Sequence, residues 1–318
     1  AVGAYALADN TTGTRNTAVG LYSLIANTTG NNNTGVGRSA LQANTTGYDN
    51  VAMGRSSLDA NTTGYGNVSV GESSLTSNTT GYRNTAVGQS TLLSCTTGAE
   101  NTAVGQNAGD AITTGGANTA IGQNSLSACQ TGNSNVAIGV NALLGTTISQ
   151  TVAVGGNALR AHTTGLYNTA VGYNALRDVT SSNYNTAIGY QAGYECVGSG
   201  NTFIGLNAGR DQTSAPNNTL VGWDAGLRIT SGGSNVVIGV AAAVKATTMD
   251  TSVIIGDDAG SNITTAGNNT IIGRSAGDDI TTGGQNVIIG KLCDGCLLYT
   301  SDAADDSLRV DLGGRRII

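Results

Sequence analysis

Apolar and polar residues alternate along this chain in a pattern that returns every seventeen residues, and its most regular part reads Asn-Thr-Ala-Val-Gly. With that Asn counted as position one, Thr or Val occupies position two, an aliphatic residue occupies position four, and Gly ends the segment at position five. β-branched residues on alternate positions before a Gly are typical of a short strand with one buried face. The pattern therefore predicts one short strand per repeat, with positions two and four facing the core and position three on the opposite face.

The glycine at position five keeps this register over residues 3–290, with two single-residue deletions, before Gly155 and before Gly205. A strict short period indicates units that cannot bury an apolar face alone and that complete a core only by stacking. We therefore predict an all-β fold over residues 1–292. The expected architecture is a parallel β-solenoid (a β-roll or β-helix, expected to be left-handed) of 17-residue repeats.

Two sets of side chains follow from this prediction. The predicted core is the rank at position four, represented by Val19, Val36, Val87, Ile121, Ile138 and Ile188. Position one is Asn in fifteen of seventeen repeats, and stacked coils place such amides about 4.8 Å apart, so that each can bond to the next. We predict a structural ladder, and not a ligand site, for Asn16, Asn33, Asn50, Asn67, Asn84, Asn101, Asn118 and Asn135.

Three other positions indicate how the coil is filled. Where position nine is Leu, as at Leu24, position twelve is usually polar, whereas Gly at position nine, as at Gly109, often comes with Ile at position twelve. Because cores accept swaps that keep volume, we expect both side chains to fill one interior space. Position three is mostly Ala but becomes large late in the array, which predicts a second apolar face covered by another chain or sheet. These large residues are Phe203, Leu220, Val237, Ile254, Ile271 and Ile288.

Composition narrows the classes of partner. Charged residues make up 11% of the chain and the net charge is −6, with no basic stretch, so nucleic acid and anionic membranes are poor partners. No apolar run has transmembrane length, and we expect no membrane insertion. The recurring β-branched residues argue for a packed core and against a disordered chain.

The residues with catalytic potential occupy one repeat position. His162, the only histidine, and Cys95, Cys129 and Cys196 all stand at position twelve, where other repeats carry Asn. We interpret them as variants of one small, partly buried structural site, and we expect no enzyme activity, cofactor or metal. Acidic residues gather near positions ten and eleven, as at Asp278-Asp279, where stacked carboxylates suit Ca²⁺ but a solvated edge is the favoured interpretation.

The repeat NTAVGxxALxxNTTGxx resembles repeats of bacteriophage and prophage tail-fibre proteins and related bacterial surface proteins. It is also similar, less closely, to the SVAIG-type repeats in the heads of trimeric autotransporter adhesins. The resemblance implies a homotrimeric β-roll shaft displayed on a virion or cell surface. The predicted function is therefore a structural or adhesive fibre segment, with the chain itself and a host-surface receptor or glycan as partners. The alternative is an ice-binding solenoid that uses Thr ladders such as Thr28-Thr29.

Both ends of the sequence depart from the repeat. Ala1-Val2-Gly3 is the tail of a pentapeptide, so we expect a fragment of a longer protein. Residues 296–318, which read CLLYTSDAADDSLRVDLGGRRII, resemble the in-frame translation of a transposase-based sequencing adapter. We interpret residues 293–318 as a non-native tail, adapter-derived from about residue 296 and expected to be disordered, in a fragment from a metagenomic assembly.

Overall fold

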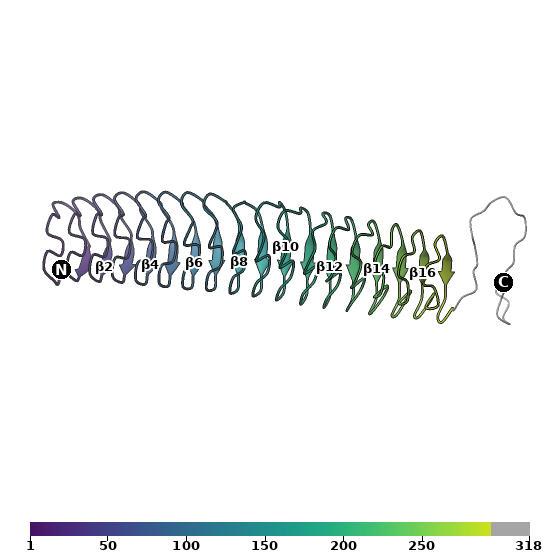
Figure 1. Ribbon diagram of the computed structural model, residues 1–318. Helices are drawn as coiled ribbons and strands as arrows, with labels where there is room; N and C mark the ends of the chain where they lie inside the picture. The colour runs from purple at the N-terminus through teal and green to yellow at the C-terminus, as the bar shows by residue number, and fades with distance from the viewer. Residues whose placement is uncertain (294–318) are drawn as a thin grey trace, which may run out of the picture. The chain divides into compact units, whose positions relative to one another are not determined.

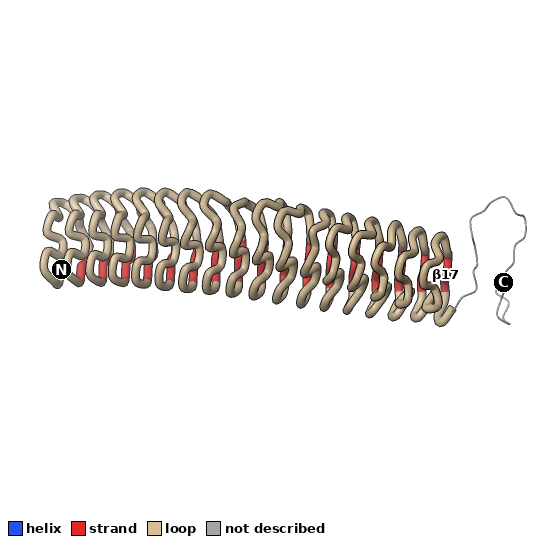
Figure 2. Tube along the Cα trace, in the orientation of Figure 1, coloured by secondary structure: helices blue, strands red, loops and turns tan. Residues whose placement is uncertain are grey.

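The computed structural model describes residues 1–293, which form strands, turns and loops with no helix among them. Figures 1 and 2 show the repeating element, a coil that holds one short strand followed by turns. The chain divides into two compact units, residues 1–170 and 171–318. The strands are parallel, so the predicted all-β parallel solenoid of 17-residue repeats is confirmed. The predicted non-native tail lies outside the described residues, apart from Cys293.

Within each unit, successive strands pair in register, as Thr17 pairs with Thr34 and Val236 with Val253. The deletions leave this pairing intact, since Thr186 pairs with Thr202. The first unit holds β1 (Thr17–Val19), β2 (Thr34–Val36), β3 (Val51–Met53), β4 (Val68–Val70), β5 (Thr85–Val87), β6 (Thr102–Val104), β7 (Thr119–Ile121), β8 (Val136–Ile138) and β9 (Val152–Val154). After β10 (Thr169–Val171) at the division, the second unit holds β11 (Thr186–Ile188), β12 (Thr202–Ile204), β13 (Thr219–Val221), β14 (Val236–Ile238), β15 (Val253–Ile255), β16 (Thr270–Ile272) and β17 (Val287–Ile289).

The strands face the opposite way from the prediction. Ala18 at position three is fully buried, whereas Val19 beside it is 38% exposed, and the other strands repeat this pattern. The prediction of a core at position four is therefore wrong. A three-residue strand alternates only once, so its pattern alone does not say which side is inside, and β-branched residues suit an exposed sheet face too. The correction applies to Val19, Val36, Val87, Ile121, Ile138 and Ile188.

The interior of the coil is narrow, and positions three, nine and twelve share it. A Cβ atom placed on Gly35, at position three, would lie 2.6 Å from Ser23 Oγ and 3.4 Å from Leu24 Cδ1, so position three leaves little room opposite Leu at position nine. A Cβ atom on Gly226, at position nine, would lie 2.9 Å from Ile229 Cδ1 and 3.0 Å from Leu220 Cδ1. The predicted swap between positions nine and twelve is confirmed at this coil, and position three is a third contributor to the same volume.

This sharing corrects the expectation of a second apolar face. The large residues at position three point into the coil and are buried, so no other chain or sheet is needed to cover them. In the five coils from Phe203 to Ile271, position nine is Gly or Ala, so the space that Leu fills elsewhere is open. The buried set is Phe203, Leu220, Val237, Ile254, Ile271 and Ile288.

The turns use a backbone conformation that L-residues rarely adopt. Tyr22 and Leu24, at positions seven and nine, have φ angles of 62° and 51°, and Arg15, at position seventeen, has 59°. Left-handed backbone costs roughly 1–2 kcal/mol per residue, and hydrogen bonds between coils offset it. At Leu24, for example, the amide donates to Ala40 O of the next coil over 3.0 Å. Leu and Tyr give no sequence signal for this conformation, which Gly would have given.

Candidate functional site

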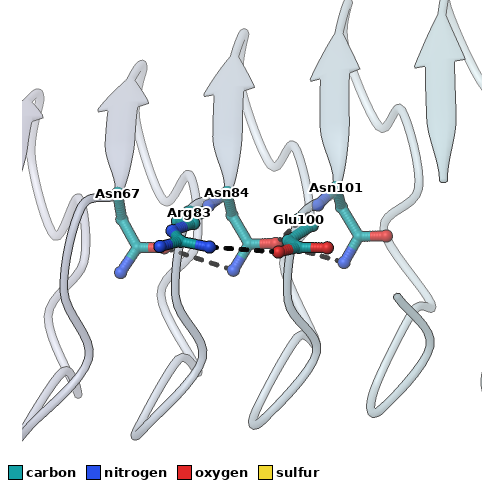
Figure 3. Close-up of polar contacts among 5 residues, drawn as sticks. All are labelled: Asn67, Arg83, Asn84, Glu100 and Asn101. Carbon is teal, nitrogen blue, oxygen red and sulfur yellow. Dashed lines mark hydrogen bonds and ion pairs between the residues drawn. The ribbon is translucent and has the colours of Figure 1, made fainter. Parts of the chain in front are cut away.

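The amides at position one form a ladder inside the stack, as Figure 3 shows for Asn67, Asn84 and Asn101. Asn84 is buried, and its Oδ1 accepts from the backbone N of Asn101 over 3.0 Å and from Asn101 Nδ2 over 3.1 Å. Asn84 Nδ2 donates to Gly98 O over 2.8 Å. The same backbone contact repeats at Asn16, Asn33, Asn50, Asn67, Asn84, Asn101, Asn118 and Asn135, so the predicted structural ladder is confirmed.

A second amide ladder, which the sequence analysis missed, runs along position twelve. Asn44 Nδ2 donates to Asn27 Oδ1 over 2.8 Å and to Gly47 O over 3.1 Å, and Asn61 and Asn78 repeat this arrangement. The ladder ends at Cys95, whose side chain brings no amide donor. As a result, Asn78 Oδ1 is buried with no hydrogen-bond partner among the described residues. The sequence signal for this ladder is the recurrence of Asn at position twelve, which is the same signal that predicts the ladder at position one.

The three cysteines of position twelve are buried in the stack. Burial raises the pKa of the Cys95 thiol to about 11 and that of Cys196 to about 12, and it also raises the pKa of Cys129. Each thiol lies near a backbone carbonyl of its own turn, as Cys95 Sγ lies 3.6 Å from Gly98 O. Their surroundings are those of inert structural cysteines, in agreement with the prediction.

We expect the buried cysteines to resist alkylation in the folded chain. With pKa values of about 11 and 12 against an ordinary 9.0, the thiolate populations of Cys95 and Cys196 fall by roughly a hundredfold or more, and burial adds a steric barrier. Timed iodoacetamide labelling read by peptide mass spectrometry should modify the exposed Cys293 first. The denatured chain is the control, and labelling of Cys95 as fast as Cys293 in the folded chain would contradict the expectation.

His162 is likewise buried at position twelve. Its Nδ1 lies 3.3 Å from Thr146 Oγ1, and its Nε2 lies 3.1 Å from Asn168 Nδ2. Burial lowers the pKa of the imidazole to about 4, partly opposed by a hydrogen bond to the Gly165 backbone. The ring is therefore neutral at pH 7 and is enclosed by polar groups of the stack, which matches the structural role predicted for it.

His162 makes the folded chain sensitive to acid. Its pKa is about 4 in the folded chain against 6.5 for an ordinary histidine, so the unfolded chain binds the proton first as pH falls. Stability is thus intact above about pH 6.5 and is lost towards pH 4, by about 2 kcal/mol between pH 7 and pH 5. Denaturant unfolding at both pH values should show this loss, and His162→Asn, the residue other coils carry here, should remove it. An equal loss in both proteins would contradict the assignment.

The acidic edge does not assemble a metal site in the part of the chain that the structure describes. Across residues 1–293, no group of three or more His, Cys, Asp or Glu side chains is placed to hold an ion. Arg210 Nε donates to Asp211 Oδ1 over 2.6 Å, and Ser261 Oγ donates to Asp278 Oδ1 over 2.5 Å. These carboxylates are bonded to neighbouring side chains. Arg83 and Glu100, drawn in Figure 3, form a similar exposed pair, with Arg83 Nη1 3.4 Å from Glu100 Oε1.

The Thr pairs lie at a turn, and the first Thr of each pair is bonded within the stack. Thr28 Oγ1 donates to Thr45 O over 3.1 Å, and Thr45 Oγ1 donates to Thr62 O over 3.0 Å. The second residue, such as Thr29, is exposed. The hydroxyl groups of each pair therefore do not form the flat, outward-facing pairs that an ice-binding array requires.

The exposed face of the sheet carries apolar side chains, and its apolar surface is broader between Tyr173 and Val240. Position four is partly exposed along both units, and in the second unit position six adds large side chains beside it. Only Gly separates the two positions, so these two ranks lie within about 7 Å of each other. The residues at position six are Tyr173, Tyr190, Leu206, Trp223 and Val240, which are 43–57% exposed.

Comparisons with known proteins give no relative for this chain. Residues 1–293 contain no helix that could cross a membrane. No protein-family model matches the chain, and neither a curated protein nor a solved structure is significantly similar to it.

Proposed function

We propose that this chain is a non-catalytic, rigid segment of an extracellular fibre, part of a virion tail fibre or of a bacterial surface adhesin, in which copies associate as a homotrimer. The observation that carries the proposal is the bonding between successive coils within each unit. Successive coils are joined by backbone hydrogen bonds and, where position one is Asn, by the buried amide ladder, for example from Asn84 to Asn101. A unit built in this way resists bending, which is the property a shaft requires.

The surroundings of the reactive side chains support a role without catalysis. An acid–base residue or nucleophile needs access to substrate and a pKa suited to its task. Cys95, Cys196 and His162 are buried, and burial shifts each pKa away from the range in which the group would react near neutral pH. We propose that recognition of a host receptor or glycan, if this segment carries it, uses exposed turns and not an enclosed site.

The proposal is tested by measuring the mass and shape of the full chain in solution. We expect light scattering coupled to size exclusion to give the mass of three copies, and small-angle X-ray scattering to give an elongated particle. A chain that stays monomeric up to high micromolar concentration would overturn the homotrimer, and a compact particle would overturn the shaft.

The ice-binding alternative has less support. It was motivated by the Thr pairs, and the hydroxyls of Thr28 and Thr45 already donate to backbone carbonyls of the next coil. A thermal-hysteresis measurement on the full chain decides this point. A clear difference between the melting and freezing temperatures of ice in its presence would support ice binding.

A further inference from the structure

The apolar side chains at position six are not required by the fold. Six successive coils of the first unit carry polar residues at this position, from Arg38 to Gln123, although Leu21 and Val140 on either side of them are apolar. In the second unit position six carries the exposed aromatic and aliphatic residues from Tyr173 to Val240. Since the backbone accepts charged residues at this position, packing within the coil does not explain the apolar residues of the second unit.

This surface is large enough for a stable interface. We define the second-unit stripe as Tyr173, Tyr190, Leu206, Trp223 and Val240 at position six, with Ile188, Ile204, Ile238 and Ile272 at position four. The position-four members are 36–42% exposed. At about 200 Å² for a large side chain, the stripe exposes roughly 800 Å², which is the area that each partner contributes to a standard protein complex. Exposed apolar patches of this size mark interaction sites in soluble proteins.

The spacing and charge of the stripe indicate what covers it. Its side chains recur once per coil, at about 4.8 Å, over at least five successive coils. A partner that packs along it must present apolar groups at the same spacing. A second copy of this stripe meets that condition because it has the same coils. Positions two, four and six carry no charge from Val171 to Val240, and the next charged residue at position six is Asp257. The stripe therefore offers nothing to a strongly charged partner.

We propose that the second-unit stripe is the surface through which copies of this chain associate, with each copy turning this face toward the common axis of the trimer. The inference rests on the proposed fibre function and names the face that would make the assembly. Trp223 lies at the centre of the stripe and is 57% exposed in the single chain, so it is the side chain we expect to be buried most on association.

Trp223 also supplies the test, because it is the only tryptophan in the chain. As the concentration of the full chain rises, its emission should move to shorter wavelength and become resistant to acrylamide quenching, in step with the mass from light scattering. The double variant Tyr190→Lys, Leu206→Lys keeps the reporter and should weaken association at least about tenfold. Arg38 and Arg55 show that the coil tolerates long basic side chains at this position, and circular dichroism checks the fold.

The matched control is Gln106→Lys, Gln123→Lys, which adds the same charge at position six of the first unit and should associate as the unmodified chain does. If the chain associates but the stripe variant associates equally well, or Trp223 emission does not move, the inference is overturned while the fibre proposal stands. If the unmodified chain remains monomeric, the inference and the homotrimer both fail, and the shape of the particle then tests the shaft alone. A shift produced by chitohexaose while the chain stays monomeric would overturn the inference and assign the stripe to a glycan.

Discussion

Gly105→Ala is expected to destabilise the folded chain by at least about 4 kcal/mol. Gly105 stands at position five with φ of 130°, a backbone conformation that only Gly adopts readily, and a Cβ atom there would lie 2.7 Å from the carbonyl carbon of Gly122. The obstacle is the backbone of the next coil, which cannot move aside without breaking the Gly122 N to Val104 O hydrogen bond. Denaturant unfolding of the full chain, followed by circular dichroism, measures the loss.

Gly66→Ala is the matched control. Gly66 lies at position seventeen with φ of 64°, and the nearest atom to an added Cβ is Arg83 Cγ at 3.6 Å. Asp49 and Arg83 adopt similar angles at the same position, so the coil accepts a side chain there. The expected cost is about 1 kcal/mol, that of a left-handed Ala. Equal losses in the two variants would contradict the claim that contact between coils fixes the glycine at position five.

The architecture was predictable because the repeats of one chain can be aligned with one another. Seventeen repeats in one chain identify the strand, the glycine after it and the Asn ladder without any relative for comparison. The facing of the strand was not predictable in the same way. Val19 suits an exposed sheet face and a buried one equally, and the deciding fact, that Leu24 fills the interior opposite position three, depends on turns whose left-handed backbone leaves no mark on Leu.

The surface that carries the further inference was hidden by the same error. If position four were in the core, the large residues at position six would have no apolar neighbour on the outside of the sheet. Once Ile188 is outside, Tyr190 two residues later extends an exposed apolar surface. The sequence held the signal all along, since five successive repeats of the second unit depart together from the polar residues found at Gln106 and Gln123.

Asn84→Ala is expected to cost about 3–4 kcal/mol, because it removes one amide but leaves several buried groups without partners. The backbone N of Asn101 and the carbonyl of Gly98 both lose their bond to Asn84, and Asn67 Oδ1 loses a donor. A buried group left unsatisfied costs roughly 1–3 kcal/mol, which is more than the net gain from forming its bond. The loss should therefore exceed that of an ordinary deletion of a hydrogen bond.

Asn84→Ser separates the ladder from simple packing, since the chain itself carries Ser252 at position one. Ser252 Oγ still accepts from the backbone N of Asn269, in the next coil, over 3.1 Å. A serine at position one therefore keeps the hydrogen bond to the backbone N of the next coil and loses only the amide donors. We expect Ser to cost about half as much as Ala. Hydrogen exchange of the Asn101 amide gives the direct readout: exchange should quicken in the Ala variant and stay slow in the Ser variant. If both variants exchange alike, the ladder does not hold that amide, and the stiffness ascribed to it must come from the backbone pairing alone.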